Sequence, residues 1–332
     1  MDLAERVLAG DRLALARLLT QIENNEPQGH QALAQLYPRT GQAHLIGVTG
    51  ASGTGKSTLV NRLAQHLRQS SPPGGGPPAS VAIVAVDPTS PYTGGAILGD
   101  RIRMRDLSGD PGVFIRSMAS RGALGGLARS TFAVVDALDA AGFGFVLIET
   151  VGAGQTEVDI ARTAHSTIVV DAPGLGDDVQ AIKAGILEIA DVLVVNKADL
   201  PGADHTLQVL RSTVEMGRPA SGVVGQAENG RSGSRWTPPV LATVATKGDG
   251  VAEVVAALAD HRDHLLASGE LTLRQRQRAR TEMEALLREA LAARWQASQS
   301  DGRFEAALER VVARQVAPRA AIAELLADSA SG

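Results

Sequence analysis

The chain has no cysteine and no long apolar run. Without cysteine among its 332 residues, disulfides, zinc–thiolate sites and thiol catalysis are excluded, and the composition fits a reducing cytoplasm. No uninterrupted apolar run reaches the roughly 18 residues that a membrane span needs. The first residues lack a basic stretch followed by an apolar one. We therefore expect a cytoplasmic protein without a signal peptide.

The chain also has little net charge and few lysines. The formal net charge of −4 gives no electrostatic reason to expect nucleic-acid binding. Hydrophobic residues make up 44% of the chain, which is enough for a buried core in one large domain or two smaller ones. Only four of the 32 basic residues are lysine, namely Lys56, Lys183, Lys197 and Lys247. In a chain so rich in arginine, a lysine indicates a position that needs a compact ammonium on a flexible side chain. For Lys183 and Lys247, chance in so small a sample is the alternative.

Short apolar runs that alternate with helical patterns predict a parallel sheet. Buried strands are expected at 44–49, 81–86, 143–148, 167–170, 192–195 and 240–244. Helices are expected between them at 56–69, 124–141 and 178–190, and after the last strand at 251–266. Strands that alternate with helices imply βαβ units, so we predict an α/β fold with a mostly parallel central sheet covered on both faces.

Helical sequence flanks this core at both ends. Residues 3–36 carry helical periodicity, and the chain from Leu271 onward is dense in Arg, Glu, Ala and Leu. We expect an N-terminal helical extension at 1–40, a core domain at 41–268 and a C-terminal helical arm at 269–332. An apolar stripe on the arm either packs on the chain's own core or pairs with a second subunit; its members are Met283, Leu286, Leu287, Ala290 and Leu291.

The segment Gly50–Ser57 fits the pattern G-x-x-x-x-G-K-S and lies between a predicted strand and a predicted helix. Glycines let the backbone turn so that its N–H groups point at phosphate oxygens, and the positive end of the following helix faces the same anion. Lys56 would place its ammonium at the β- and γ-phosphates, and the Ser57 hydroxyl could bind Mg²⁺. The predicted phosphate contacts come from Gly50, Ser52, Gly53, Thr54, Gly55, Lys56, Ser57 and Thr58.

The segment Asn196-Lys197-Ala198-Asp199 follows a predicted strand about 140 residues beyond the phosphate loop. A carboxylate accepts two hydrogen bonds side by side, and guanine presents two adjacent donors that adenine lacks. Asp199 would be left unpaired against ATP, which carries a large penalty. The segment therefore predicts guanine binding by Asn196, Lys197 and Asp199, with a helix-capping role for Asn196 or Asp199 as the alternative.

Three carboxylates are candidates to hold Mg²⁺ beside the Ser57 hydroxyl. Glu149 ends a predicted strand three residues before Gly152, at a point where small GTPases usually have aspartate. The Gly152 N–H could meet the γ-phosphate. Asp87 ends the second predicted strand, and Asp100 lies in a glycine-containing segment that could form a first switch loop. A turn or capping role is the alternative for Asp100.

Hydrolysis also needs a group that orients the attacking water. Gln155 could do so, although it lies three residues after Gly152 and not immediately after it as in Ras-like switch loops. Gln155 then completes a predicted catalytic set with Lys56 at the phosphates and Glu149 at the metal.

Taken together, these segments resemble the MeaB/ArgK group of bacterial GTPases, which are metallochaperone-like P-loop G proteins of the SIMIBI class associated with methylmalonyl-CoA mutase. The most specific matches are VDPTSPYTGGAILGDRIRM at 86–104 and PGLGDDVQAIKAGILEIAD at 173–191. Further matches lie at 48–59, 149–158, 196–199 and 236–241. The resemblance runs from about residue 3 to residue 326.

The resemblance implies a G domain with a short helical N-terminal extension and a C-terminal helical dimerisation arm. It implies GTP/GDP and Mg²⁺ as cofactors, with slow GTP hydrolysis that a partner stimulates. The implied partners are a B12-dependent acyl-CoA mutase, by default methylmalonyl-CoA mutase, and a second copy of the chain, with cobalamin adenosyltransferase as a further candidate. The protein would gate adenosylcobalamin delivery and protect the mutase from inactivation.

The resemblance also assigns residues outside the phosphate loop. The segment Gly174–Gly185 matches the family's third switch, which relays nucleotide state to the partner through Asp177, Asp178 and Lys183. Val244 and Ala245 match the segment that contacts the guanine base, normally through a backbone N–H. Because Val244 stands where the family usually has serine, a hydroxyl is absent there. The insert at 70–80 is not typical of the family, and no function is assigned to it.

Two other functions stay open at this point. A GTPase for nickel insertion of the hydrogenase or urease type would belong to the same class, but such proteins usually carry Cys/His metal motifs, whereas this chain has no cysteine and only scattered histidines. A P-loop small-molecule kinase would normally use ATP, and Asn196–Asp199 argues against it.

Overall fold

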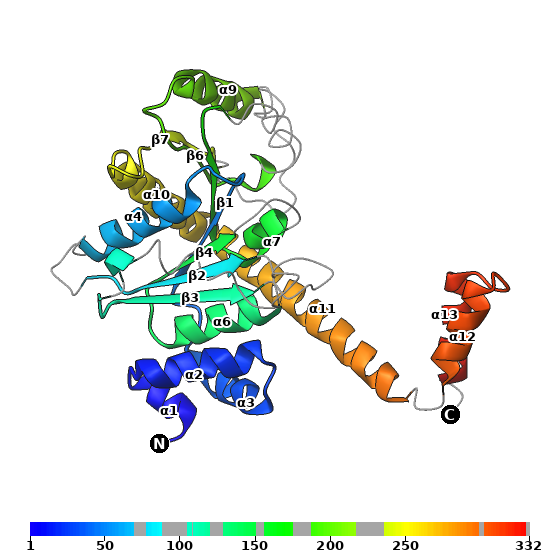
Figure 1. The fold of residues 1–332 in the computed structure, drawn as a ribbon. Coiled ribbons are helices and arrows are strands. Elements are labelled where there is room, and N and C mark those ends of the chain that lie inside the picture. Colours follow the sequence, from blue (N-terminus) through cyan, green and yellow to red (C-terminus); the bar gives the residue numbers. More distant parts are fainter. Residues whose placement is uncertain are drawn as a thin grey trace. The chain divides into compact units, whose positions relative to one another are not determined.

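The computed structural model describes residues 1–69, 78–87, 105–107, 109–119, 129–150, 156–174, 187–216, 236–298 and 302–329. Its centre is a seven-stranded sheet in the order β3-β2-β4-β1-β5-β6-β7 (Figure 1). Every neighbouring pair of these strands is parallel. The predicted α/β fold with a mostly parallel central sheet is therefore confirmed.

Six strands coincide with predicted apolar runs, and β3 was not predicted. The strands are β1 (His44–Thr49), β2 (Val81–Asp87), β3 (Val113–Ala119), β4 (Phe145–Thr150), β5 (Ser166–Asp171), β6 (Val192–Val195) and β7 (Val240–Ala242). β3 forms an edge of the sheet, where Arg116 and Ser117 are tolerated because that strand is only partly covered. β7 ends earlier than predicted, because the chain turns after Thr243 and Val244 pairs with Asp249 instead.

Helices cover both faces of the sheet, and helices also form the N-terminal and C-terminal parts of the chain. The described helices are α1 (Leu3–Leu8), α2 (Arg12–Glu23), α3 (Pro27–Leu36), α4 (Lys56–Gln69), α6 (Arg129–Ala140), α7 (Thr156–Thr163), α9 (Ala203–Met216), α10 (Val251–Ser268), α11 (Glu270–Ser298), α12 (Arg303–Val312) and α13 (Pro318–Ser329). Short 3₁₀ helices lie at Tyr37–Arg39, Arg105–Leu107 and Leu187–Ile189. Most of the helix predicted at 178–190 lies outside the described residues. In the part of the chain that the structure describes, no helix is both long and apolar enough to cross a membrane.

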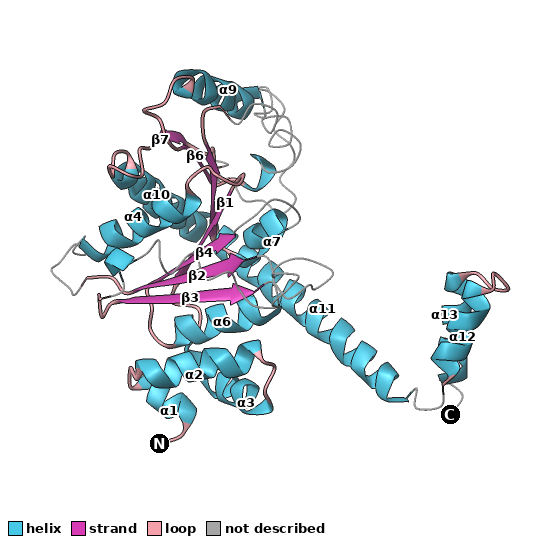
Figure 2. Cartoon of the chain, in the orientation of Figure 1, coloured by secondary structure: helices cyan, strands magenta, loops and turns pink. Residues whose placement is uncertain are grey.

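Alternate strand residues face opposite sides of the sheet and build two apolar cores. On one face, Leu45 and Ile148 join a core with α2, α3 and α6. On the other face, Ile46 and Leu147 join a core with α4 and α10 (Figure 2). Because both faces are covered, the central strands are apolar and buried almost throughout, as expected for a parallel sheet.

The N-terminal helices pack on α6, below the sheet in Figure 1. Leu18 of α2 is fully buried in the core that these helices share with the sheet. Two arginines add polar contacts to β3 and the turn before it: Arg116 donates to Glu23 at 2.6 Å, and Arg12 donates to the Pro111 carbonyl at 2.6 Å. These helices are thus bound to the sheet and to α6 by packing and by hydrogen bonds.

The chain divides into two compact units, Met1–Ala279 and Arg280–Gly332, and α11 runs across the division. The first turns of α11 are held to the rest of the first unit by partly buried ion pairs. Arg274 contacts both carboxylate oxygens of Asp191 at 2.8 Å, and Arg278 contacts Asp136 at 2.7 Å. Burial favours a higher pKa for Asp191, but the His261 ring 3.2 Å away and the hydrogen bonds from Arg274 outweigh it and hold that pKa below its usual value.

Candidate functional site

The carboxyl ends of β1, β4, β5 and β6 meet at one edge of the sheet, which is where parallel α/β folds bind ligands. The loop Gly50–Ser57 follows β1, Glu149 lies near the end of β4, and Asn196 comes directly after β6. Residues that lie far apart in the sequence therefore converge here. This edge is the candidate functional site.

Two glycines allow the loop after β1 to lie against its neighbours. Gly50 has φ +137°, and a Cβ there would lie 2.0 Å from the Val170 carbonyl oxygen of β5. Gly55 has φ +92°, and a Cβ there would lie 2.4 Å from Nδ2 of Asn196. A side chain at either position would collide with these atoms as well as strain the backbone. The glycines of the phosphate-loop pattern thus have a steric reason in this structure.

Lys56 is buried beneath the loop at the first turn of α4. Its Nζ donates to the carbonyl oxygens of Gly50 at 2.7 Å and Ala51 at 2.9 Å. The ammonium therefore lies at the N-terminus of a helix, whose backbone N–H groups also attract anions. Ser52, Gly53 and Thr58 are exposed around it, whereas Thr54 is buried. This arrangement suits a phosphate group.

Ser57 and Glu149 place two oxygen atoms side by side. The Ser57 hydroxyl donates to Oε1 of Glu149 at 2.6 Å, and Glu149 is only 1% exposed. Mg²⁺ prefers oxygen ligands and usually takes one or two carboxylates together with phosphate oxygens and water. The pair therefore fits a magnesium ion. Asp87 ends β2 beside β4, as predicted from the strand pattern, but its side chain lies outside the description.

Asn196 joins the phosphate loop to the segment after β7. Its side chain is 2% exposed, and Nδ2 donates to the Thr54 carbonyl oxygen at 2.8 Å. Its Oδ1 accepts from the Ala245 N–H at 3.0 Å and from the Thr243 hydroxyl at 3.1 Å. The side chain does not cap a helix, since α9 begins only at Ala203. Asn196 is therefore a buried brace between two loops.

The two charged residues after Asn196 differ in their surroundings. Lys197 has a left-handed backbone (φ +58°), and its Nζ donates to the Gly53 carbonyl oxygen of the phosphate loop at 2.7 Å. Asp199 is 40% exposed, and its carboxylate lies 3.4 Å from Nζ of Lys247. An exposed ion pair of this kind is weak. The Asp199 carboxylate is thus accessible to a base beside the loop.

The segment expected to contact the base from the other side is already hydrogen-bonded. The Val244 N–H donates to the Asp249 carbonyl oxygen at 3.0 Å, and the Ala245 N–H donates to Asn196. A backbone contact from Val244 or Ala245 to a base would compete with these bonds.

Arg62 of α4 is part of the site, although no sequence motif marks it. Its Nε donates to the Ala245 carbonyl oxygen at 3.0 Å, and its terminal nitrogen donates to the Thr246 carbonyl oxygen at 2.8 Å. Backbone acceptors leave no trace in a sequence, so this contact could not be predicted.

Several predicted site residues lie outside the described residues. They are Asp100, Gly152, Gln155, Asp177, Asp178 and Lys183. Their predicted roles stay predictions.

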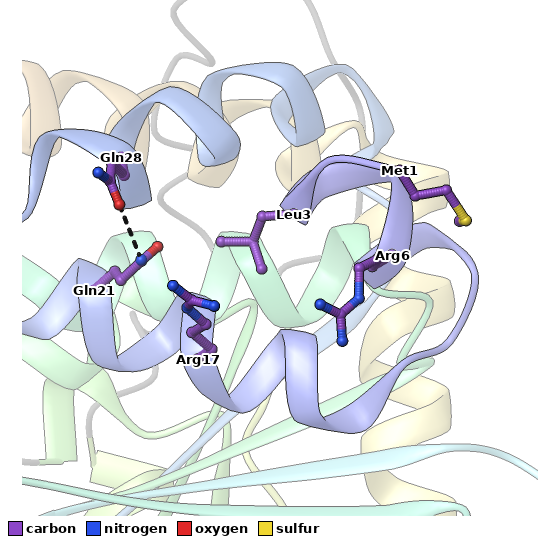
Figure 3. Close-up of a pocket in the computed structure, with 6 residues that line it drawn as sticks. All are labelled: Met1, Leu3, Arg6, Arg17, Gln21 and Gln28. Carbon is purple, nitrogen blue, oxygen red and sulfur yellow. Dashed lines mark hydrogen bonds between the residues drawn. The ribbon is translucent and has the colours of Figure 1, made fainter.

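A pocket of about 280 Å³ lies elsewhere, between the N-terminal helices (Figure 3). It is lined by Met1, Leu3, Arg6, Arg17, Gln21 and Gln28. Gln21 donates to Gln28 across it at 3.5 Å. All of these residues belong to the N-terminal helices and their ends, so the pocket is separate from the site at the sheet edge.

Comparison with known families identifies the group to which this site belongs. The family described as "Methylmalonyl Co-A mutase-associated GTPase MeaB" matches residues 15–300. The chain belongs to this family. The MeaB resemblance seen in the sequence is thereby confirmed, and it supports a P-loop enzyme that binds guanine nucleotide and hydrolyses GTP.

Relatives and a solved structure agree with the family. A protein of Pyrococcus abyssi that is named as a GTPase is 43% identical over 331 residues, which cover 100% of this chain and 97% of that protein. The mitochondrial methylmalonic aciduria type A homolog of Caenorhabditis elegans is 31% identical over 290 residues, covering 82% of this chain and 68% of that protein. A crystal structure of an LAO/AO transport system kinase superposes with a TM-score of 0.69 at 26% identity, covering 97% and 95% of the two chains.

The brace predicts that Asn196 and Asp199 contribute differently to stability. Asn196→Ala should lower the free energy of unfolding by about 2–3 kcal/mol, because buried polar groups of Thr54 and Ala245 lose their partner. Asp199→Ala should change it by less than about 0.5 kcal/mol, because that side chain is half-exposed. Urea denaturation without nucleotide measures both values. Equal values for the two variants would contradict the brace.

Proposed function

We propose that this MeaB family protein is a GTP-hydrolysing chaperone of a B12-dependent acyl-CoA mutase, and that methylmalonyl-CoA mutase is its partner. It would gate adenosylcobalamin delivery and protect the mutase from inactivation, with cobalamin adenosyltransferase as a further candidate partner. The mutase association is supported by the description of the matching family and by the name of the C. elegans relative. Nucleotide binding is best supported by the hydrogen bonds through which Asn196 joins the phosphate loop to the segment around Ala245.

The residues at the sheet edge divide the work of binding. Lys56 and the N-terminus of α4 would hold the β- and γ-phosphates, and Asp199 would accept the two donors of guanine. Ser57 and Glu149 would hold Mg²⁺, which neutralises charge on the phosphates when bound. Of the remaining candidates, Asp87 and Asp100 would complete the metal surroundings, and Gln155 would orient the attacking water.

The mutase proposal is tested by GTP hydrolysis with and without the partner. Phosphate release by the full chain with Mg²⁺ should be slow alone and should rise at least several-fold as methylmalonyl-CoA mutase is added. Lys56→Ala should show neither rate, because the phosphates lose their buried ammonium. If no acyl-CoA mutase stimulates hydrolysis, the chaperone proposal is wrong, while the GTPase assignment stands.

We also propose that the C-terminal helices form a homodimer arm at 269–332. Large apolar side chains of α11 are exposed: Met283 by 69%, Leu287 by 59% and Leu291 by 57%. Within the second unit, α12 and α13 form a small core around Ala307 and Leu325, against which Trp295 of α11 packs. The predicted stripe on α11 therefore has apolar surface to offer a second subunit.

A charge placed in this stripe should break the dimer. Leu287→Glu should shift the protein from dimer to monomer in light scattering at about 10 µM, because a carboxylate would be buried without a partner. Ala292→Glu is the matched control, since it adds the same charge to an exposed position on the opposite face of the helix. A wild-type protein that is monomeric at this concentration would contradict the proposal.

A further inference from the structure

We propose that Arg62 is a positioning residue that fixes the base side of the nucleotide site against helix α4 and so sets its affinity and selectivity for guanine nucleotides. The proposal rests on the guanine-nucleotide site and is independent of the mutase partner. Arg62 lies on α4 and would act on the nucleotide through residues 243–247, which we call the base-side segment.

The base-side segment is hydrogen-bonded on both sides of one residue, Ala245. The Ala245 N–H donates to Asn196 on one side, at 3.0 Å, while its carbonyl oxygen accepts from Nε of Arg62 on the other side, also at 3.0 Å. Arg62 holds the next carbonyl as well, that of Thr246, at 2.8 Å. Ala245 is 2% exposed, so its bonds to Asn196 and to Nε of Arg62 are shielded from water at least in part, which strengthens them, whereas the bond to Thr246 is exposed.

The same helix serves both ends of the nucleotide. α4 begins at Lys56 and Ser57, which face the phosphates, and Arg62 lies six residues further along it. A helix is rigid over this length, so Arg62 fixes the distance between the phosphate loop and the base-side segment. Lys247, at the end of that segment, meets the Asp199 carboxylate at 3.4 Å. More firmly, the N–H of Ala198, which precedes Asp199 in the chain, donates to the Thr243 carbonyl oxygen at 3.0 Å, so displacing the segment would also disturb Asp199, the residue proposed to bind guanine.

Arginine is suited to this role by its shape. The guanidinium presents several N–H donors in a fixed plane, and here three of its nitrogens are used: two for the carbonyls and the third for Oε1 of Gln65 at 2.9 Å. Gln65, one turn further along α4, thus fixes the orientation of the guanidinium plane. Lysine would supply a charge without the planar fork.

The test compares nucleotide binding in three variants of the full chain. Affinities for GDP and IDP are measured by calorimetry with Mg²⁺ at a temperature well below unfolding. IDP lacks the exocyclic amine of guanine, so the preference for GDP over IDP reports how well Asp199 is aligned. Arg62→Met should weaken GDP binding about tenfold and reduce the preference about threefold, and Arg62→Lys should fall between this variant and the wild type.

Arg68→Met is the matched control on the same helix. Arg68 also holds a backbone carbonyl, that of Ala79 at 2.8 Å, and pairs with Asp110, but it does not contact the base-side segment. This variant should lower the melting temperature and leave both affinities and their ratio unchanged.

The proposal is overturned if Arg62→Met lowers only the melting temperature and leaves GDP affinity and the GDP/IDP preference at wild-type values. Should Arg62→Met not fold, Arg62→Lys decides the matter, since wild-type values for both quantities in that variant would also refute the role. A wild-type protein that binds ADP as tightly as GDP would instead refute the guanine site itself.

Discussion

The proposed nucleotide site depends on one buried side-chain amide, that of Asn196. Asn196 donates to the phosphate loop at Thr54 and accepts from Ala245 and Thr243, so both its nitrogen and its oxygen are used. In a buried setting such bonds are strong, and an unpaired group is costly. The loops that they connect follow three different strands, namely β1, β6 and β7. Ala245 also packs in the apolar core with α4 and α10, so these hydrogen bonds and that core together fix the geometry of the site.

Other residues of the site are arranged around the Asn196 side chain. Gly55 must lack a side chain, because a Cβ there would meet Nδ2 of Asn196. Arg62 donates to the carbonyl oxygen of Ala245, whose N–H is bonded to Asn196. Lys197, next to Asn196 in the chain, donates to the Gly53 carbonyl oxygen of the phosphate loop. The residues predicted to bind the phosphates and those predicted to bind the base thus form one connected hydrogen-bonded framework. This framework explains how a site built from residues about 190 positions apart can keep one shape.

The sequence predicted the parts of the site that leave a pattern. Apolar runs placed the strands, and glycine spacing placed the loop around Lys56, because buried parallel strands and phosphate loops restrict residue type. The edge strand β3 was missed because Arg116 and Ser117 interrupt its apolar residues. Arg62 binds a backbone carbonyl oxygen, which every residue has, so the sequence does not mark its partner. Arg274 pairs with Asp191, and the sequence does not show which of many distant carboxylates an arginine will meet. Such contacts appear only once the fold is known.

The central claim is that this edge of the sheet is a site for guanine nucleotides. Calorimetric titration of the full chain with GDP and with ADP, each with Mg²⁺, tests it most directly. The account predicts that GDP binds at least about a hundredfold more tightly, because adenine leaves the Asp199 carboxylate without its two donors. Equal affinity for ADP and GDP would contradict the account.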